Sequence, residues 1–302
     1  MRRILDRRTR LDQVGLVARL GMGAAAFVAM LTVMFGNVAQ ALAQQVPQQL
    51  PHAWGLNFQD AASPVMREVH NFHHMLMWVI TLITIFVLAL LVYVMVRFRA
   101  SANPVPSKTS HNTLVEVAWT VVPILILIVI AVPSFKLLYF GDKTKEAGLT
   151  IKAIGKQWFW SYEYPDNGNF TFDAIMVAEK DLKPGQPRLL ETDNTVVVPV
   201  DTNIRLLVTA ADVIHAWAMP AFGVKKDAVP GRLNETWFRA EREGLFYGQC
   251  SEICGAYHGY MPIKLQVVSK EAFAKWAEEA KQKFASVDGP SPRLAAADAA
   301  AQ

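Results

Sequence analysis

Two long apolar runs dominate the hydrophobic pattern of this 302-residue chain. The first extends from Met75 to Val96 and the second from Val117 to Phe135, and neither contains a charged residue. A helix rises about 1.5 Å per residue, so the first run would be about 33 Å long, which matches the hydrocarbon core of a bilayer. Both runs are therefore predicted to be membrane-spanning helices. Pro123 and Pro133 would kink the second helix unless neighbouring groups satisfy the carbonyls that they free.

The pattern changes to short segments between residues 149 and 268. Ile263, Leu265 and Val267 alternate with polar residues, as expected for a half-buried strand. Other segments rich in β-branched and aromatic residues, separated by Pro-Gly turns, occur at 151–164, 195–200 and 204–210. A region of short strands of this length predicts an antiparallel β-sandwich.

The two ends of the chain have patterns of their own. Five arginines between Arg2 and Arg10 precede an apolar stretch that ends at Ala41-Leu42-Ala43, which predicts a cleaved signal peptide. An uncleaved membrane anchor is the alternative, although three glycines weaken that stretch as a spanning helix. At the other end, a helix is predicted over 271–285, followed by an Ala- and Pro-rich tail.

These patterns divide the chain into five expected parts. They are a signal peptide (1–43), a periplasmic N-terminal segment (44–72), a transmembrane helical hairpin (73–140), a periplasmic β-domain with a C-terminal helix (141–285) and a disordered tail (286–302). A two-helix hairpin is small for a membrane protein that acts alone. We therefore expect a subunit docked on a larger partner, with a self-contained anchor as the alternative.

The distribution of charge predicts the orientation. The loop between the apolar runs contains Arg97, Arg99 and Lys108 and no acid before Glu116, so the positive-inside rule places it in the cytoplasm. The β-domain is then expected in the periplasm of a bacterium, anchored in the inner membrane. The net charge of +4 comes entirely from residues 1–43, so the rest of the chain lacks the basic excess typical of nucleic-acid binding.

The candidate chemistry is concentrated near residue 250. Both cysteines of the chain, Cys250 and Cys254, lie within twelve residues that also contain His258 and Met261, and His215 is the other histidine of the β-domain. Thiolate, imidazole and thioether together favour copper, whereas zinc sites rarely use Met. A mononuclear blue-copper site needs one Cys, so the second thiolate indicates two coppers that share both sulfurs. A plain disulfide is the alternative, because the periplasm is oxidising.

Longer motifs around these residues resemble subunit II of haem-copper cytochrome c oxidases of the alphaproteobacterial and mitochondrial type. The resemblance covers roughly residues 60–280, and the motifs that carry it are Lys156-Gln-Trp-Phe-Trp-Ser-Tyr-Glu-Tyr164, Gly223-Val-Lys-Lys-Asp-Ala-Val-Pro-Gly-Arg-Leu-Asn234 and Tyr247-Gly-Gln-Cys-Ser-Glu-Ile-Cys254. It implies a two-helix transmembrane hairpin followed by a cupredoxin-like Greek-key β-sandwich that carries a dinuclear copper centre, CuA. The implied ligands are His215, Cys250, the backbone carbonyl of Glu252, Cys254, His258 and Met261. The Glu252 side chain matches the family's ligand to a magnesium or manganese ion at the interface with subunit I.

The resemblance also implies partners for the outer surface. Trp158 matches the tryptophan through which cytochrome c delivers its electron, although Trp158 and Trp160 alternating on a strand more often indicate core packing. The acids that match the docking face for cytochrome c are Glu163, Asp166, Asp173 and Asp212. Acids around such a point would speed the encounter with a basic partner.

One membrane residue gains a role in the same way. Glu116 lies at the predicted start of the second spanning helix, where an acid often only stabilises the helix dipole. Its context matches the family's glutamate at the mouth of a proton pathway into subunit I. Lys156 and Phe159 depart from the family, whose members more often have His and Tyr at these positions.

The function expected from this resemblance is that of the electron-accepting subunit of a proton-pumping oxidase. It would receive electrons from cytochrome c and pass them to haem a of subunit I, with subunit III as a further partner. A quinol oxidase subunit would lack the copper ligands, and a nitrous oxide reductase would have a long additional catalytic domain. A membrane-anchored copper chaperone or blue-copper carrier remains the alternative from another class.

Overall fold

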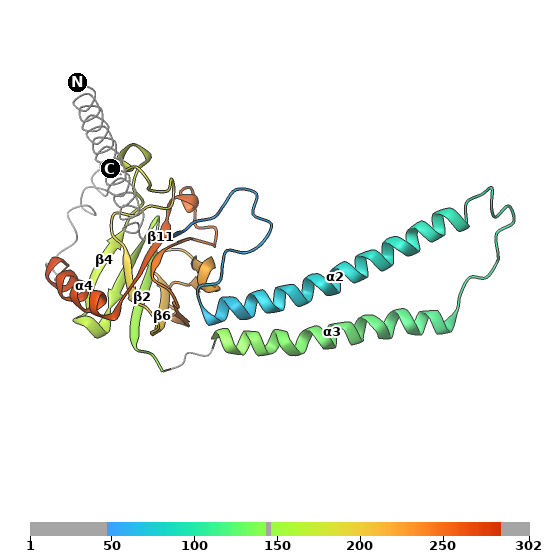
Figure 1. The fold of residues 1–302 in the computed structure, drawn as a ribbon, viewed down its shortest axis with the longest axis horizontal. Helices are drawn as coiled ribbons and strands as arrows, with labels where there is room; N and C mark the ends of the chain where they lie inside the picture. The colour runs from blue at the N-terminus through green and yellow to red at the C-terminus, as the bar shows by residue number, and fades with distance from the viewer. Residues whose placement is uncertain (1–46, 143–145, 285–302) are drawn as a thin grey trace, which may run out of the picture. The chain divides into compact units, whose positions relative to one another are not determined.

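The computed structural model describes residues 47–142 and 146–284, shown in Figure 1. The predicted signal peptide over 1–43 and the predicted disordered tail over 286–302 lie outside these residues. In chain order the elements are β1 (Gln48–Gln49), α2 (Pro64–Arg97), α3 (Thr113–Asp142), β2 (Leu149–Lys156), β3 (Phe159–Tyr164), β4 (Phe170–Ala174), β5 (Val196–Pro199), β6 (Asn203–Ala210), β7 (His215–Met219), β8 (Val224–Ala228), β9 (Asn234–Arg239), β10 (Gly244–Gln249), β11 (Pro262–Val268) and α4 (Lys270–Lys283). Short 3₁₀ turns follow β3, β4 and β7 and precede β11, at η1 (Pro165–Asn167), η2 (Glu179–Asp181), η3 (Pro220–Phe222) and η4 (His258–Tyr260).

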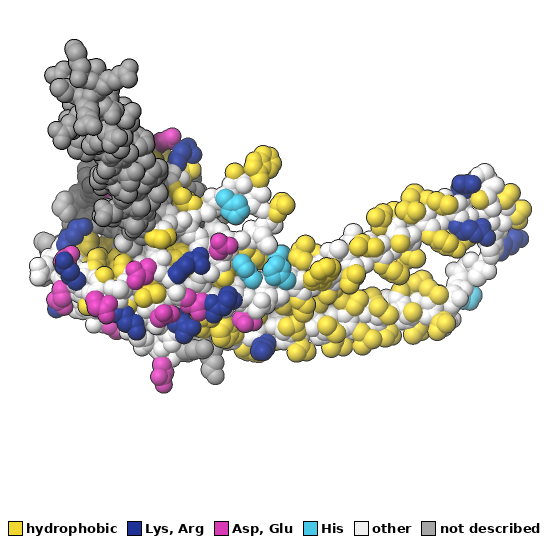
Figure 2. All heavy atoms as spheres, in the orientation of Figure 1, with side chains coloured by type: hydrophobic (Ala, Val, Ile, Leu, Met, Phe, Trp, Pro, Cys, Tyr) yellow, Lys and Arg dark blue, Asp and Glu magenta, His cyan; other side chains and the backbone are white. Residues whose placement is uncertain are grey.

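Helices α2 and α3 are both long and apolar enough to cross a membrane. Their surfaces are covered by hydrophobic side chains, as Figure 2 shows. Each helix extends beyond its predicted apolar run because polar residues cap it: the Ser63 Oγ accepts from the Met66 N–H at 3.0 Å, and the Asn112 Oδ1 accepts from the Leu114 N–H at 3.1 Å. Helix α3 continues through Pro123 and Pro133 without a break.

The β-domain is built from two larger sheets and a two-stranded ribbon. The strand orders are β1-β10-β11-β5 and β4-β3-β2-β6-β9, and β7 pairs with β8. This confirms the predicted fold class, a spanning hairpin followed by a cupredoxin-like sandwich. The expected purely antiparallel arrangement is wrong, since β2 pairs with β6 and β11 with β5 in parallel. Both parallel partners are joined by long connections, as parallel pairing requires.

The segment 151–164 is two strands rather than one continuous strand. Strands β2 and β3 pair antiparallel, with Lys156 opposite Phe159, and Gln157 and Trp158 form the turn between them. Trp160 therefore points into the core, where it is fully buried, whereas Trp158 lies in the turn and is only partly buried. The expectation that the two tryptophans alternate on one strand is wrong, because a tight turn places Trp158 at the end of the sheet.

A cluster of aromatic side chains fills the space between the sheets. The Tyr164 hydroxyl donates to the Val197 carbonyl at 2.9 Å and accepts from the Val197 N–H at 3.0 Å, which joins β3 to β5 of the other sheet. Helix α4 closes one end of this cluster, where Trp276 packs edge-on against Tyr164 at 5.2 Å between ring centroids. The predicted C-terminal helix is therefore part of the core.

The outer ends of the hairpin are bonded to the β-domain. The Ala62 N–H donates to the Ala221 carbonyl at 2.8 Å, and the Ser63 Oγ donates to the Phe222 carbonyl at 2.7 Å. On the other helix, the Trp237 Nε1 donates to the Phe140 carbonyl at 3.0 Å. These contacts join the spanning helices to the sheets at the residues just before α2 and at the end of α3.

Candidate metal centre

The loop between β10 and β11 carries all but one of the predicted copper ligands. The antiparallel register places Gln249 opposite Pro262, and the loop is closed by a hydrogen bond from the Cys250 N–H to the Met261 carbonyl at 3.4 Å. His215 is the first residue of β7. The Ser251 N–H donates to the Ala216 carbonyl at 3.0 Å, so the loop is attached to β7 directly beside His215. Pairing of β10 with β11 and of the loop with β7 thus brings residues 35 or more positions apart to one place.

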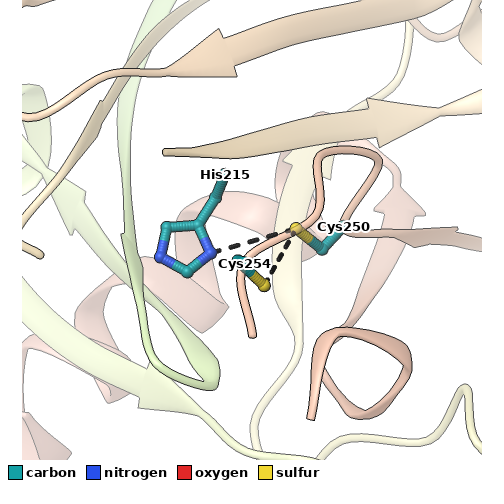
Figure 3. Close-up of side chains that lie close together, drawn as sticks. All are labelled: His215, Cys250 and Cys254. Atoms are coloured by element: carbon teal, nitrogen blue, oxygen red, sulfur yellow. Dashed lines mark hydrogen bonds between the residues drawn. The ribbon is translucent and has the colours of Figure 1, made fainter. Parts of the chain in front are cut away.

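The predicted ligand atoms converge on the two cysteine sulfurs. The Cys250 and Cys254 Sγ atoms are 3.9 Å apart, and the His215 Nδ1 lies 3.9 Å from the Cys250 sulfur (Figure 3). The Glu252 carbonyl lies 3.4 Å from the same sulfur. Around the Cys254 sulfur, the His258 Nδ1 is at 3.6 Å and the Met261 thioether at 3.5 Å. Every predicted ligand group therefore lies within 3.9 Å of a cysteine sulfur.

The His215 ring is held in one orientation from both sides. Its Nε2 lies 2.8 Å from the Asp212 Oδ1, so Nε2–H donates to the carboxylate and Nδ1 faces the Cys250 sulfur. The ring is fully buried, and Trp160 packs edge-on against it at 6.0 Å. On the β2 side, a Cβ on Gly155 would come within 2.7 Å of the His215 Cδ2 atom, so only glycine leaves room for the ring there.

Electrostatics of the site make one of the two thiols acidic. Burial by itself raises the pKa of a thiol, but hydrogen bonding to His215 and to the backbone outweighs it, and the pKa of Cys250 falls to about 6. Burial, together with the charge of the Cys250 thiolate, raises the pKa of Cys254 to about 12. Burial would lower the pKa of His215, yet its bonds to Cys250 and Asp212 raise it. The pair of sulfurs therefore keeps one proton near neutral pH, which a metal bound to both would release.

The donor set fits copper better than the alternatives. Both cysteines are free thiols, and their separation of 3.9 Å is far above the S–S length of about 2.05 Å in a disulfide. Sulfur and imidazole donors suit copper, and a thioether beside them is unusual for zinc. His215, Cys250 and Cys254 are all buried, and their ligand atoms lie within 4.8 Å of one another. The site is thus a compact cluster of soft donor atoms that could hold copper.

Trp158 lies directly against this site. Its indole Nε1 donates to the Cys254 carbonyl at 3.2 Å, and the Gln157 Nε2 donates to the same oxygen at 2.8 Å. The turn between β2 and β3 therefore joins the ligand loop through the backbone of a ligand residue. Gln157 also donates its N–H to the Asp212 carboxylate at 2.6 Å.

The four acids expected on a docking face all have partners within the chain. Glu163 pairs with Lys152 at 3.0 Å, and Asp173 lies 3.9 Å from the Lys156 ammonium and 2.5 Å from the Ser161 hydroxyl. Asp166 accepts from the Thr150 N–H at 2.7 Å. Asp212 is bonded to His215 and to two backbone N–H groups. Lysines therefore accompany two of these acids. Glu163 and Asp166 lie beside the first half of β2, and the turn with Trp158 follows the other end of that strand.

Two predicted carboxylate residues are exposed in the single chain. Glu116 is in the first turn of α3, at the far end of the hairpin from the β-domain, and is exposed in this single chain. The Glu252 side chain is exposed while its carbonyl faces Cys250. Both residues are therefore at the surface of the single chain.

Sequence reasoning missed three residues that shape the site. Gly155 makes room for His215, Gln157 binds the Cys254 carbonyl, and Ser251 attaches the loop to β7. Gln157 and Cys254 are 97 positions apart, so no local pattern marks their contact. Gly155 was the one available signal, because a glycine inside a strand often marks a place where another group packs closely against the backbone.

Comparison with known proteins gives a consistent result for both parts of the chain. Residues 149–268 match the family model "Cytochrome C oxidase subunit II, periplasmic domain", and residues 51–137 match "Cytochrome C oxidase subunit II, transmembrane domain". A probable cytochrome c oxidase subunit 2 of Rickettsia felis is 51% identical over 246 residues, covering 82% of this chain and 78% of that protein. Cytochrome c oxidase subunit 2 of Oenothera berteroana is 50% identical over 229 residues, covering 74% of this chain and 89% of that protein.

A solved structure is also similar. The crystal structure of the periplasmic domain of subunit II of cytochrome oxidase from Bradyrhizobium japonicum has 61% sequence identity, covers 47% of this chain and 99% of that one, and gives a TM-score of 0.45. The family models together span more than half of the chain, and the relatives extend across the hairpin and the β-domain. The chain therefore belongs to the cytochrome c oxidase subunit II family, the membrane-anchored subunits of a respiratory oxidoreductase.

Proposed function

We propose that this chain is the electron-accepting subunit of its oxidase and holds a dinuclear copper centre, CuA. The observation that carries the proposal is the convergence of His215, Cys250, Cys254, His258, Met261 and the Glu252 carbonyl on two sulfurs 3.9 Å apart. A single copper needs one thiolate, whereas two buried thiolates with a histidine beside each suit two coppers. When bound, such a pair supplies a site that gains and loses one electron at a time.

Residues of the chain orient the proposed ligands and exclude water from that site. One electron leaves ferrous cytochrome c, which becomes ferric, and one electron passes on to haem a of subunit I; no bond of this chain forms or breaks. The Asp212 carboxylate holds the His215 tautomer, as a carboxylate commonly does for a metal-binding histidine. Burial of His215 and both cysteines excludes water and keeps the ligands in place.

Trp158 is the proposed point of electron input. Its indole is partly exposed, and its N–H is bonded to the carbonyl of the ligand residue Cys254. This contact gives a short connection from the surface of the domain to the metal ligands. The same bond supports the assignment over simple core packing, since the core tryptophan of this segment is Trp160.

Four acids of the outer domain are proposed to guide a basic cytochrome c. Glu163 lies on β3, Asp166 in η1, Asp173 on β4 and Asp212 in the loop between β6 and β7. Lys152 and Lys156 pair with Glu163 and Asp173 and partly neutralise their charge. The attraction of this surface for cytochrome c should therefore be weaker than the number of acids suggests.

The remaining proposed roles involve the other subunits. The exposed Glu252 carboxylate would bind magnesium or manganese at the interface with subunit I. Glu116 would lie at the mouth of a proton pathway into subunit I, which would pump protons as dioxygen is reduced, and subunit III would complete the complex. These roles rest on the resemblance of the motifs and on the exposure of both carboxylates.

The proposed location is the bacterial inner membrane with the β-domain in the periplasm, after removal of a signal peptide over 1–43. The basic loop between α2 and α3 supports this orientation. A reporter that is active only outside the cytoplasm should be active when fused after Phe140. Activity after Arg99 together with silence after Phe140 would reverse the orientation.

The copper proposal is tested on the purified membrane complex. We expect two coppers per copy of this chain and an electron-spin spectrum of one unpaired electron shared between them. Cys250→Ser and Cys254→Ser should each remove that spectrum, because each variant loses one of the two thiolates that would hold the metals, whereas Met261→Leu should shift it mildly. One copper per chain with an ordinary blue-copper spectrum, or absence of haem a from the complex, would instead favour a blue-copper carrier.

A further inference from the structure

The Trp158 indole is seated on the backbone of the ligand loop. Its Nε1 donates to the Cys254 carbonyl, and its ring lies over Gly255, where an added Cβ would come within 3.0 Å of the Trp158 Cζ2 atom. Gly255 has a φ of +121°, a conformation that favours glycine. The loop is therefore shaped to let the indole approach its backbone closely.

A second aromatic ring holds the indole from the side. The Tyr257 ring meets Trp158 edge-on, with 5.0 Å between the ring centroids and 71° between the ring planes. This is the favourable geometry for an aromatic pair. Tyr257 itself is fixed by the loop backbone, because the His258 N–H donates to Gly255 and the Tyr260 N–H donates to the Tyr257 carbonyl at 2.9 Å.

The Tyr257 ring is not among the proposed metal ligands. It is 56% exposed, it precedes the proposed ligand His258, and it contacts the rings of Trp158 and Tyr260. A large, exposed ring held against Trp158 is consistent with a function at the surface. Among the described residues, one hydrogen bond and packing against the core hold the indole besides Tyr257, so removal of the neighbouring ring would leave the indole less firmly held.

We propose that Tyr257 is a positioning residue for electron input: its ring fixes the Trp158 indole in contact with the Cys254 backbone. The inference rests on the proposed function of Trp158. The electron given up by the ferrous cytochrome reaches the copper centre by way of the indole, and the rate depends on how constantly the indole keeps its contact with the ligand loop. Tyr257 increases the fraction of time in which that contact is made.

The test uses the intact oxidase complex and rapid measurement of electron transfer from reduced cytochrome c. Tyr257→Ala should slow transfer within the formed complex by roughly 2- to 10-fold, the range expected for loss of one aromatic pair. The KM for cytochrome c, the copper content and the spectrum of the centre should stay unchanged. Tyr257→Phe should retain the wild-type rate, because it keeps the ring edge.

Tyr260→Ala is the matched control. Tyr260 is an exposed tyrosine of the same loop and next to the ligand Met261, and its ring contact is with Tyr257 rather than with Trp158. It should transfer electrons close to the wild-type rate. An equal slowing in Tyr260→Ala, or a changed copper spectrum in Tyr257→Ala, would overturn the inference, because the effect would then arise from the loop as a whole.

Trp158→Phe separates this inference from the proposed function. If Trp158→Phe is slow while Tyr257→Ala has the wild-type rate, electron input through Trp158 stands and the role of Tyr257 is wrong. If Trp158→Phe has the wild-type rate, electron input through Trp158 is wrong, whatever Tyr257→Ala does.

Discussion

Asp212 connects three segments of the domain through one carboxylate. It accepts hydrogen bonds from the His215 ring, from the Gln157 N–H in the turn after β2 and from its neighbour Val213 at 2.7 Å. These bonds, against the cost of burial, lower the pKa of Asp212, so the group is a carboxylate near neutral pH. A residue that the sequence suggests as a docking acid thus also supports a proposed metal ligand.

Replacement of Asp212 should therefore weaken the metal site more than the fold. Asp212→Asn keeps the shape but loses the charge that fixes the His215 tautomer, and we expect copper affinity to fall by about 10- to 100-fold. Competition with a copper chelator measures this, with circular dichroism as the check on folding. Asp166→Asn is the control, since Asp166 is bonded only to the Thr150 N–H of β2 among the contacts described. Equal affinities in the two variants would contradict the supporting role.

Lys156 modifies the surface on which the partner is expected to dock. Its ammonium lies 3.9 Å from Asp173, on the strand that leads to Trp158. Lys156→Gln should speed association with a basic cytochrome c about twofold at low salt, because one unit charge about 10 Å away contributes about 0.4 kcal/mol in water. Stopped-flow association rates at increasing ionic strength measure it, and the gain should vanish at high salt.

The control for Lys156→Gln is a variant that loses the same charge at an exposed site elsewhere. Lys180 lies in the loop after β4, in η2, and is exposed. Lys180→Gln should leave the association rate near the wild-type value. A gain as large as that of Lys156→Gln would show that net charge, rather than the surface beside Trp158, controls the encounter.

The cluster of proposed ligand residues is visible in the sequence, but the residues that hold them are not. Cys250, Cys254, His258 and Met261 lie in one short loop, so their chemistry is visible as a motif. The contacts of Gln157 with Cys254 and of Asp212 with Gln157 depend on strand pairing between distant segments. Their partners are fixed only when β2, β7 and β10 come together.

At the scale of elements, length and hydrophobicity predicted the spanning helices well, and alternation predicted β11. Ile263, Leu265 and Val267 are all buried, as their alternation indicates. The sheet topology was not predictable in the same way, because parallel pairing of β2 with β6 depends on a connection through β3, β4 and β5 that leaves no periodic signal. The turn at Gln157 and Trp158 was missed because it contains neither glycine nor proline.

The packing of β2 against β7 leads to a prediction about Gly155. An added methyl group would lie 2.7 Å from the His215 ring, which cannot move away because Asp212 and Trp160 hold it. Gly155→Ala should therefore lower copper occupancy sharply while the sheets remain folded. Copper content per chain and circular dichroism together measure the two effects.

Gly259→Ala is the matched control for Gly155→Ala. Gly259 is in the ligand loop, next to His258, and nothing lies within 4 Å of the position that its Cβ would take. Copper occupancy should be close to that of the wild type. A normal copper content in Gly155→Ala would show that the His215 ring can shift without loss of the site.

At the scale of the whole molecule, the hairpin supplies none of the proposed metal ligands, but the residues just before it contribute to the stability of the β-domain. All ligands lie beyond residue 214, but Ala62 and Ser63 bond to Ala221 and Phe222, and β1 pairs with β10. A soluble fragment from Gly141 onward should bind two coppers, as we propose for the full chain. It should lose them at a lower temperature, because removal of residues before α2 costs several hydrogen bonds, about 1–4 kcal/mol in total.

Thermal loss of the copper absorbance, in the fragment and in the detergent-solubilised full chain, measures this difference. Absorbance at equal copper content is the control for equal loading. A fragment that cannot be loaded would mean that the hairpin is needed to form the site. Equal melting temperatures would mean that the contacts of Ala62 and Ser63 add nothing to the stability of the β-domain.

The distance between the two sulfurs also bears on how the metal site would be assembled. Two thiols 3.9 Å apart, one of them acidic, are a short movement from a disulfide, and a cysteine bonded in that way cannot bind copper. In the periplasm proposed for this domain, an oxidant could therefore close the pair before copper binds, and a reductant would then be needed to reopen it. If the proposed centre forms, its assembly would depend on the supply of both reducing equivalents and copper.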